Sequence, residues 1–177
     1  MALHGGEGGG HLQDELCAGV VVHWLATQPS RAARLIEASD AEVDATIDEL
    51  LRLDDPFVSN RRVATREAVV DGCPVAVGDV IVLDWRAANR DPAAFADPDR
   101  FEPYAHAAQN LVYGTGVHAC PGRGLATLEL RVLLRELLAA GELELDARHP
   151  ATREAPPVAG FRTVPVRLRP IGARPGA

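Results

Sequence analysis

The chain contains no lysine, so all 18 of its basic residues are arginine. Acidic residues number 25, and the resulting formal net charge of −7 argues against nucleic acid as a partner, because nucleic-acid-binding domains present clustered positive charge. No apolar stretch approaches the roughly 20 residues that a membrane-spanning helix needs. The first residues also lack the basic start and the apolar core of a signal peptide. These absences predict a protein without a membrane anchor.

Cysteine is scarce as well, occurring only at Cys17, Cys73 and Cys120. The three lie far apart and none belongs to a Cys-x-x-Cys pair, which disfavours a zinc site. His118 and Cys120 would supply half of a metal site, and no further ligands are evident nearby. Unpaired cysteines fit a reducing compartment, so the predicted location is the cytoplasm. An isolated cysteine is usually an inert core residue, so a role in metal binding has to rest on the surrounding sequence.

The length of 177 residues suits one domain, and the pattern of apolar residues predicts an α+β, mainly helical chain. Residues 1–12 are glycine-rich and expected to be flexible, residues 13–170 form the core, and residues 171–177 form a tail. Helices are expected over 13–27, 30–38, from a capping box at Ser39 to about Leu53, and after Cys120 as far as Gly141. Short strands are expected at 61–65, 68–70, 80–84 and 164–168, with a meander rich in proline and aspartate over 91–112.

The most informative segment is 113–124, which reads Tyr-Gly-Thr-Gly-Val-His-Ala-Cys-Pro-Gly-Arg-Gly and leads into a helical stretch. It places Cys120 on a glycine-rich loop at the start of a helix. Loop amides and the positive end of the helix dipole favour a thiolate at this position. The glycines allow the backbone to approach a flat group. A thiolate so placed is suited to ligate iron from one face of a planar cofactor.

This segment resembles the haem-ligand loop of the cytochrome P-450 family. The family pattern is an aromatic residue, Gly, any, Gly, any, His or Arg, any, Cys, any, Gly. Tyr113 stands where Phe is more usual, and the other fixed positions match. The resemblance implies that Cys120 is the axial thiolate ligand of a haem b iron, toward which a thiolate pushes electron density. The cofactor-binding residues that it implies on this loop are Tyr113, Gly114, Gly116, His118, Cys120 and Gly122.

Glu49 and Arg52 lie three residues apart on a predicted helix and can pair on one face. Taken alone, such a pair is most simply a surface ion pair that contributes roughly 0.3–0.5 kcal/mol. Glu-x-x-Arg is also the family's buried structural pair, completed there by an arginine in a later Pro-Asp-Arg-Phe segment, which this chain has at 98–101. The resemblance therefore implies a network of Glu49, Arg52 and Arg100 under the haem loop that holds shape. The intervening residues 88–98 are typical of bacterial members.

The two haem propionates need cationic or hydrogen-bonding partners once they are buried. His118, two residues before the ligand, matches a family position that contacts a propionate. Arg62 matches the other usual partner, whereas read alone it is a solvated charge on an edge strand. Alternation along a strand decides whether Arg61 or Arg62 points inward, and the sequence leaves both open.

The resemblance covers nearly all of this chain but only the C-terminal part of the family's fold, so the distal N-terminal half is absent. In the family, a helix above the haem carries an Ala-Gly pair followed by an acid and a threonine that relay protons. Counting back from Pro29 places this relay at 9–14, where the chain reads Gly-Gly-His-Leu-Gln-Asp. Leu12 and Gln13 stand near the expected acid and threonine. The usual pair is missing, although His11 or Asp14 could still move protons.

Two functions follow from the resemblance, and neither assigns a catalytic residue to this chain. One is an oxidoreductase, a haem-thiolate monooxygenase that inserts oxygen into a small organic substrate with electrons from a ferredoxin-like donor. A homodimer or a second subunit would then complete the pocket, since burying one face of an apolar cofactor contributes several kcal/mol at about 25 cal/mol per Å². The alternative is a non-catalytic haem-binding or auxiliary protein, or an inactive fragment. The substrate is not predicted, because the residues that choose it lie mostly in the missing part.

Overall fold

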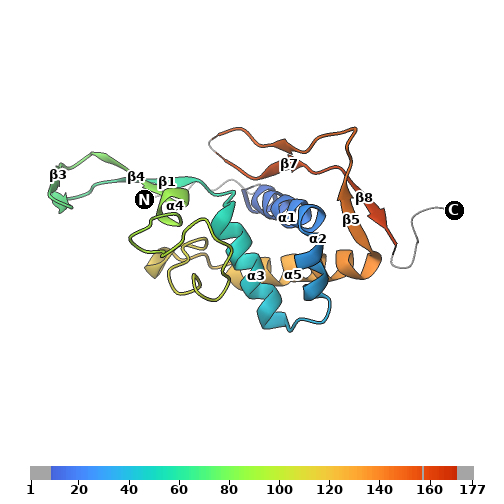
Figure 1. The fold of residues 1–177 in the computed structure, drawn as a ribbon. Helices are drawn as coiled ribbons and strands as arrows, with labels where there is room; N and C mark the ends of the chain where they lie inside the picture. The colour runs from blue at the N-terminus through green and yellow to red at the C-terminus, as the bar shows by residue number, and fades with distance from the viewer. Residues whose placement is uncertain (1–8, 157, 171–177) are drawn as a thin grey trace.

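The computed structural model describes residues 9–156 and 158–170, with side chains from Asp14 onward. Three long helices form the body, and short antiparallel strand pairs flank it (Figure 1). The helices are α1 (Gly9–Thr27), α2 (Pro29–Ala32), η1 (Ala33–Leu35), α3 (Asp40–Leu53), α4 (Trp85–Ala88), η2 (Gly116–His118) and α5 (Arg123–Ala140). The strands are β1 (Ser59–Val63), β2 (Ala68–Val70), β3 (Cys73–Val75), β4 (Val80–Asp84), β5 (Glu142–Leu145), β6 (Thr152–Arg153), β7 (Phe161–Thr163) and β8 (Val166–Arg169). The predicted α+β, mainly helical class is confirmed.

The hydrophobic core lies where α1, α3 and α5 meet. Val21 of α1, Ile47 of α3 and Leu134 of α5 are all fully shielded from solvent. Val43, Ile47, Leu50 and Leu51 recur at helical spacing, so α3 presents one continuous apolar face to its neighbours. Each such side chain contributes roughly 1.5–3 kcal/mol when it is fully buried. This packing sets the orientation of α3, and with it the inward direction of Glu49 and Arg52.

The start of α3 is fixed by the predicted capping box. The backbone amide of Glu42 donates to Ser39 Oγ at 3.3 Å, and the backbone amide of Ser39 donates to Glu42 Oε2 at 2.8 Å. These two bonds satisfy backbone donors that the first helical turn leaves without partners. The helix therefore begins at Asp40, and its end at Leu53 also agrees with the expected boundary.

Several elements differ from those expected. The strands expected at 61–65 and 164–168 are shifted to Ser59–Val63 and Val166–Arg169, and the last part of the chain holds β5, β6 and β7 as well as β8, where one or two strands were expected. Helix α1 begins at Gly9 and not at residue 13, so part of the supposed flexible segment is helical, because a helix propagates cooperatively from its packed turns. The helix expected over 30–38 is divided between α2 and η1. Strand β3 was not anticipated, since Pro74 disfavours a strand. The Asp71-Gly72 turn, with both residues at positive φ, nevertheless pairs it with β2 in a tight hairpin.

The strands form four separate antiparallel pairs, which are β1–β4, β2–β3, β5–β8 and β6–β7. The β1–β4 ribbon and the β2–β3 hairpin extend away from the helical body (Figure 1). Val63 pairs with Val80 along this ribbon, and both are more than half exposed, as is Val82. Among the described residues, no helix combines the length and apolar character needed to cross a membrane.

Strand β7 and the loop before it lie directly against α1. A side chain added at Gly19 would meet the Phe161 carbonyl at 2.9 Å, and one at Gly160 would meet Leu16 at 3.2 Å. The amide of Ala159 donates to the Pro56 carbonyl at 3.0 Å. The loop that follows α3 is therefore enclosed between α1 and the β6–β7 hairpin.

This enclosure buries Asp55, which is only 2% exposed. Its Oδ1 accepts from the Phe57 amide at 2.7 Å, while its Oδ2 has no hydrogen-bond partner in the described part of the chain. Burial raises the pKa of Asp55 from its ordinary 3.8 to about 7, against the opposing effects of the Phe57 amide and Arg86. The carboxyl is therefore largely protonated in mildly acidic solution.

A pH-dependent stability follows from this shift. Between about pH 4 and pH 7 the folded chain holds a proton on Asp55 that the unfolded chain has lost, so stability falls as pH rises through this window. Asp55→Asn should remove this dependence, which amounts to about 4 kcal/mol for a pKa raised from 3.8 to about 7, at about 1.4 kcal/mol per pKa unit. Urea unfolding of both proteins at pH 5 and pH 8 measures it, and we expect the variant to gain relative stability at pH 8. An equal difference in the free energy of unfolding between the two proteins at pH 5 and at pH 8 would show that Asp55 ionises normally.

Candidate functional site

The glycine-rich loop folds back on itself between Leu111 and the start of α5. The Cys120 amide donates to the Tyr113 carbonyl at 2.8 Å, and the Gly114 amide donates to the Leu111 carbonyl at 2.8 Å. Gly114 has φ +69° and Gly116 has φ +66°. Residues with a side chain rarely adopt this conformation, so the loop requires glycine at both positions. The matched glycines are thus explained by backbone geometry.

Cys120 is exposed and takes part in no disulfide. It lies just before Gly122, the N-cap of α5, where the unpaired amides and the helix dipole favour negative charge. A side chain at Gly122 would come within 3.8 Å of Cys120 Sγ. Within the described residues, no cluster of three or more histidine, cysteine or acidic side chains could hold a metal ion, so a zinc-type ligand set is not formed there. The loop thus offers a single accessible sulfur beside backbone that is free of side chains, which fits one face of a planar group.

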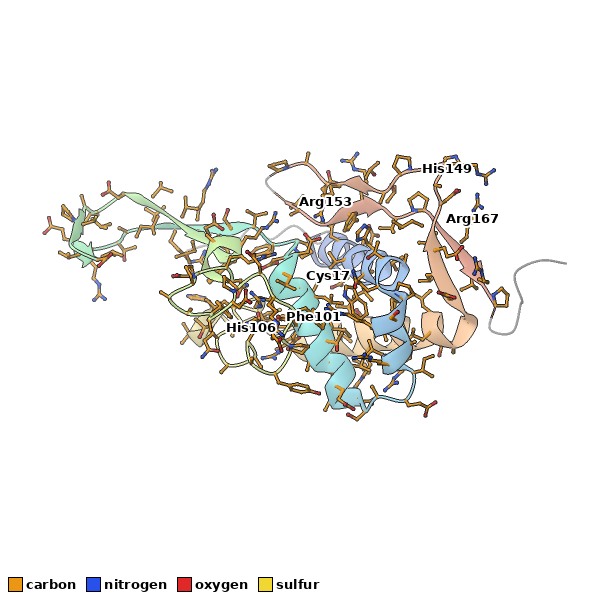
Figure 2. The ribbon with its side chains drawn as sticks, in the orientation of Figure 1. Cys17, Phe101, His106, His149, Arg153 and Arg167 are labelled. Atoms are coloured by element: carbon orange, nitrogen blue, oxygen red, sulfur yellow. The ribbon has the colours of Figure 1, made fainter. Side chains whose placement is uncertain are left out.

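Cys17 does not compete for this role. It is half-buried on α1 (Figure 2), and burial, reinforced by the negative charges of Asp55, Asp14 and Cys120, raises its pKa to about 12. It therefore remains a neutral thiol. Cys73 is exposed on β3, in the hairpin that extends from the body.

The two cationic residues expected to bind propionates lie on different elements. His118 is exposed at the end of η2, inside the loop itself. On β1, Arg62 is half-buried while Arg61 is exposed, so strand alternation favours Arg62 as the inward residue. Arg62 Nη1 donates to the Arg61 carbonyl at 2.9 Å. Its contact with a propionate stays a prediction.

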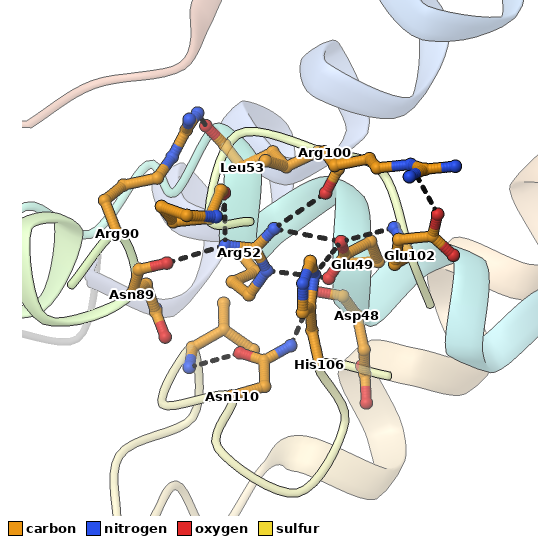
Figure 3. Close-up of polar contacts among 12 residues, drawn as sticks. Asp48, Glu49, Arg52, Leu53, Asn89, Arg90, Arg100, Glu102, His106 and Asn110 are labelled. Carbon is orange, nitrogen blue, oxygen red and sulfur yellow. Dashed lines mark hydrogen bonds and ion pairs between the residues drawn. The ribbon is translucent and has the colours of Figure 1, made fainter. Parts of the chain in front are cut away.

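Glu49 and Arg52 form a buried ion pair, and each residue is only 1% exposed (Figure 3). Arg52 Nε donates to Glu49 Oε2 at 2.7 Å, and Arg52 Nη2 donates to Glu49 Oε1 at 2.9 Å. The remaining Arg52 donors reach the carbonyls of Asn89 at 2.6 Å, Pro98 at 2.9 Å and Arg100 at 3.2 Å. The planar guanidinium therefore binds one carboxylate and three backbone carbonyls at once.

Glu49 accepts two further hydrogen bonds from the meander. The Glu102 amide donates to Oε1 at 2.8 Å, and His106 Nδ1 lies 2.7 Å from the same oxygen. Burial acts to raise the pKa of Glu49, but the hydrogen bonds from Arg52, Glu102 and His106 outweigh it, so the pKa lies below its usual value. The carboxylate is thus charged and fully bonded, as a buried ionic group must be.

The expected role of the Arg100 side chain is wrong in one respect. Arg100 joins the network only through its backbone carbonyl, while its side chain is 68% exposed and pairs with Glu102 at 2.7 Å. The third side chain of the network is His106, which is 5% exposed and meets Phe95 edge-on. His106 and the Glu102 amide both bond Glu49 Oε1, and they supply the contacts that a second arginine was expected to make.

This arrangement predicts that two alanine substitutions differ in how much they lower the free energy of unfolding. Arg100→Ala should change the free energy of unfolding by less than about 1 kcal/mol, because its ion pair is exposed. His106→Ala removes a buried hydrogen bond to a charged group and should cost about 1.5–3 kcal/mol. Chemical unfolding of the two variants compares these values directly. A larger loss for Arg100→Ala than for His106→Ala would restore the expected role of the arginine.

Two asparagines connect the network to the loop. Asn89 Oδ1 accepts from the Leu111 amide at 2.8 Å. Asn110 donates from Nδ2 to the Asp48 carbonyl at 2.9 Å, and its Oδ1 accepts from the Val112 amide at 2.9 Å. The residues just before Tyr113 are therefore fixed to α3 and to the meander. Sequence reasoning missed these two roles and that of His106, since no periodic pattern distinguishes polar residues inside a meander.

The proton-relay positions fall in the first turn of α1. The backbone is helical from Gly9, but the side chains of residues 9–13, which include His11, Leu12 and Gln13, lie outside the described part. Asp14 is described and exposed. The relay therefore stays a prediction.

Comparison with known proteins agrees with these features. The sequence model of the family described as Cytochrome P-450 matches residues 42–169. The chain is 39% identical to the putative cytochrome P-450 140 of Mycobacterium tuberculosis over 126 residues, which are 71% of this chain and 29% of that protein. It is 38% identical to the erythromycin C-12 hydroxylase of Saccharopolyspora erythraea over 141 residues, which are 77% of this chain and 35% of that protein. The chain thus spans about a third of these relatives.

Solved structures match over most of the chain. A mutant of P-450 EryK in complex with erythromycin B superposes with a TM-score of 0.79 at 32% identity, covering 90% of this chain and 41% of that one. HmtT, involved in himastatin biosynthesis, superposes with a TM-score of 0.81 at 32% identity, covering 89% of this chain and 40% of that one. With the family's sequence model matching well over half of the residues, and with the fold in agreement, this chain is a member of the cytochrome P-450 family and contains part of its fold.

Proposed function

We propose that residues 113–124 form the haem-binding centre of a haem-thiolate monooxygenase, with Cys120 as the axial ligand of a haem b iron. The observation that carries this proposal is the closed loop, in which an exposed cysteine lies between two glycines at positive φ and the N-terminus of α5. When bound, a thiolate-ligated haem supplies the activation of oxygen or peroxide and the transfer of an oxygen atom to an organic substrate.

The protein's part in this chemistry is to hold and shield the cofactor. Gly114, Gly116 and Gly122 leave the backbone bare where the flat macrocycle would approach. The α5 N-terminus stabilises the negative charge of the Cys120 thiolate. His118 and Arg62 supply cationic or hydrogen-bonding groups for the two propionates, whose burial requires such partners.

The network around Glu49 and Arg52 has a supporting role. Arg52 binds the backbone carbonyls of Asn89, Pro98 and Arg100. The side chain of Asn89 in turn accepts a hydrogen bond from the Leu111 amide. Because the Leu111 carbonyl in turn accepts the Gly114 amide, the network holds the base of the loop in place. It therefore positions Cys120 without touching the substrate.

A further polypeptide surface is part of the proposal, because α5 is apolar on two sides. Leu130 and Leu134 are buried against α1 and α3, whereas Leu125, Leu128 and Val132 are 63%, 45% and 51% exposed. Exposed apolar side chains gathered on one helix mark a surface that another polypeptide covers. A second subunit, or a second copy of the chain, would cover this face and the distal side of the haem. A ferredoxin-like protein would donate electrons, and the complex would operate in the cytoplasm.

One feature favours a second candidate function, a non-catalytic haem-binding or auxiliary protein. Counted back from Pro29, Leu12 and Gln13 stand near the positions where the family's acid and threonine are expected to relay protons. Without this pair, oxygen bound at an open face would be exposed to bulk water, which favours leakage of reactive species over insertion. Haem binding through Cys120 is common to both functions.

The test is the absorption spectrum of the chain after reconstitution with haem, reduction and addition of carbon monoxide. A thiolate-type spectrum supports the proposed centre, and haem of another type, or none, contradicts it. Mass in solution and product formation with a redox donor and a panel of small substrates then separate the two functions. We expect an oligomeric or partner-dependent protein that turns over slowly with peroxide, if at all. A monomer with tightly coupled, donor-driven hydroxylation would contradict the need for a partner.

A further inference from the structure

The side chain of Tyr113 lies at the base of the loop, between α3 and α5. Its hydroxyl oxygen is 3.3 Å from Thr127 Oγ1 of α5. The guanidinium of Arg123 lies over its ring, with the central carbon 5.0 Å from the ring centroid. Burial raises the pKa of Tyr113 far above its usual value, so the group stays a neutral phenol that can both donate and accept.

The same contacts extend from Tyr113 to α3. Arg123 Nη2 donates to Asp48 Oδ2 at 2.8 Å, while Asp48 Oδ1 is buried and has no hydrogen-bond partner in the described part of the chain. Burial raises the pKa of Asp48, and the charge of Arg123 opposes this rise. The phenol thus contacts Thr127 through its hydroxyl and the Arg123–Asp48 ion pair through the face of its ring.

We propose that Tyr113 is a positioning residue, whose hydroxyl ties the Cys120 loop to α5 through Thr127 and whose ring packs under Arg123, the ion-pair partner of Asp48 on α3. The backbone carbonyl of the same residue accepts the Cys120 amide at 2.8 Å. Fixing the Tyr113 ring therefore restricts the Tyr113 carbonyl oxygen, which accepts the hydrogen bond from the Cys120 amide. Phenylalanine, the more usual residue at this position in the family pattern, would fill the same space and leave the Thr127 hydroxyl without this partner.

The positioning of Cys120 as an iron ligand rests on the proposed function, whereas the ordering of the loop by Tyr113 does not. The first experiment therefore uses the haem-free chain and measures amide hydrogen exchange of peptides from the loop. Tyr113→Phe should accelerate exchange in the 113–122 segment about two- to tenfold, as expected when one net hydrogen bond is lost from a local opening. Peptides from the β5–β8 pair should exchange at the wild-type rate.

The chain offers a matched control, because its only other tyrosine, Tyr104, is 68% exposed. Tyr104→Phe should leave exchange in the loop unchanged. Thr127→Val should reproduce the effect of Tyr113→Phe, and the double variant should add less than the sum, since the two groups share one contact. Wild-type exchange in Tyr113→Phe, or equal acceleration in all peptides, would overturn the tethering role.

A second measurement addresses Cys120 in the haem-loaded chain. We expect Tyr113→Phe to lower the thiolate-type fraction of the carbon-monoxide spectrum relative to the Tyr104→Phe control at equal haem content. A purely structural role would reduce haem content and leave this fraction unchanged, and that result would overturn the positioning of the ligand. If neither protein binds haem, the proposed function fails, and the exchange experiment alone decides whether the hydroxyl orders the loop.

Discussion

Cys120→Ala is expected to abolish the thiolate-type carbon-monoxide spectrum entirely. Cys120 carries the only sulfur on the loop, and Cys17 on α1 cannot replace it because burial keeps it a neutral thiol. Only a deprotonated cysteine ligates iron in the required way. The folded chain should otherwise be unaffected, since the exposed side chain makes no contact on which the core depends.

The control for this prediction is the exposed Cys73. Cys73→Ala alters an exposed residue in the protruding hairpin and should retain the full thiolate-type spectrum. Cys120→His tests ligand identity, since imidazole binds haem iron without supplying a thiolate. Haem that remains loosely bound with an altered spectrum agrees with the assignment. A spectrum that survives in Cys120→Ala would refute it.

Glu49→Ala should destabilise the fold by about 3–5 kcal/mol, the usual effect of removing one partner from a buried ion pair. The variant leaves Arg52 charged and 1% exposed, without its carboxylate. It also deprives the Glu102 amide and His106 of their acceptor. Domains of this size have only about 5–15 kcal/mol of total stability, so the expected outcome is insoluble or haem-free protein.

Glu129→Ala is the matched control, because Glu129 is an exposed residue within α5 and pairs with no cation in the described part of the chain. It should change the free energy of unfolding by no more than about 0.5 kcal/mol. Solubility, haem content and urea unfolding of the two variants give the comparison. Soluble Glu49→Ala protein with normal haem content would mean that the buried pair is dispensable.

The helices could be predicted from the sequence because their signals are local. The Ser39–Glu42 capping box and the apolar spacing from Val43 to Leu51 determine α3, and both depend on residues within one or two turns. The loop motif could also be predicted, since the positive φ angles of the loop require glycine, and glycine stands at both positions, Gly114 and Gly116. These parts of the fold needed no knowledge of distant contacts.

The partners of Glu49 could not be predicted in the same way. His106 lies 57 residues from Glu49 along the chain, and only the path of the meander brings them together. The match of residues 98–101 to the family segment predicts the Arg100 side chain in the buried network. In the structure, only the backbone carbonyl of Arg100 takes part, as an acceptor from Arg52. The hydroxyl of Tyr113 gave no sequence signal either, because its contact with Thr127 joins the loop to a helix 14 residues further along the chain.

The ribbon of β1 and β4 has a consequence for handling the chain. Both of its strands are sheet edges, with only one neighbour each, and Val63, Val80 and Val82 are exposed along it. Unpaired edges with exposed apolar side chains template the addition of strands from other molecules. We therefore expect concentrated chain to self-associate along this ribbon through cross-strand pairing. Charged substitutions at these valines would be the direct way to keep it dispersed.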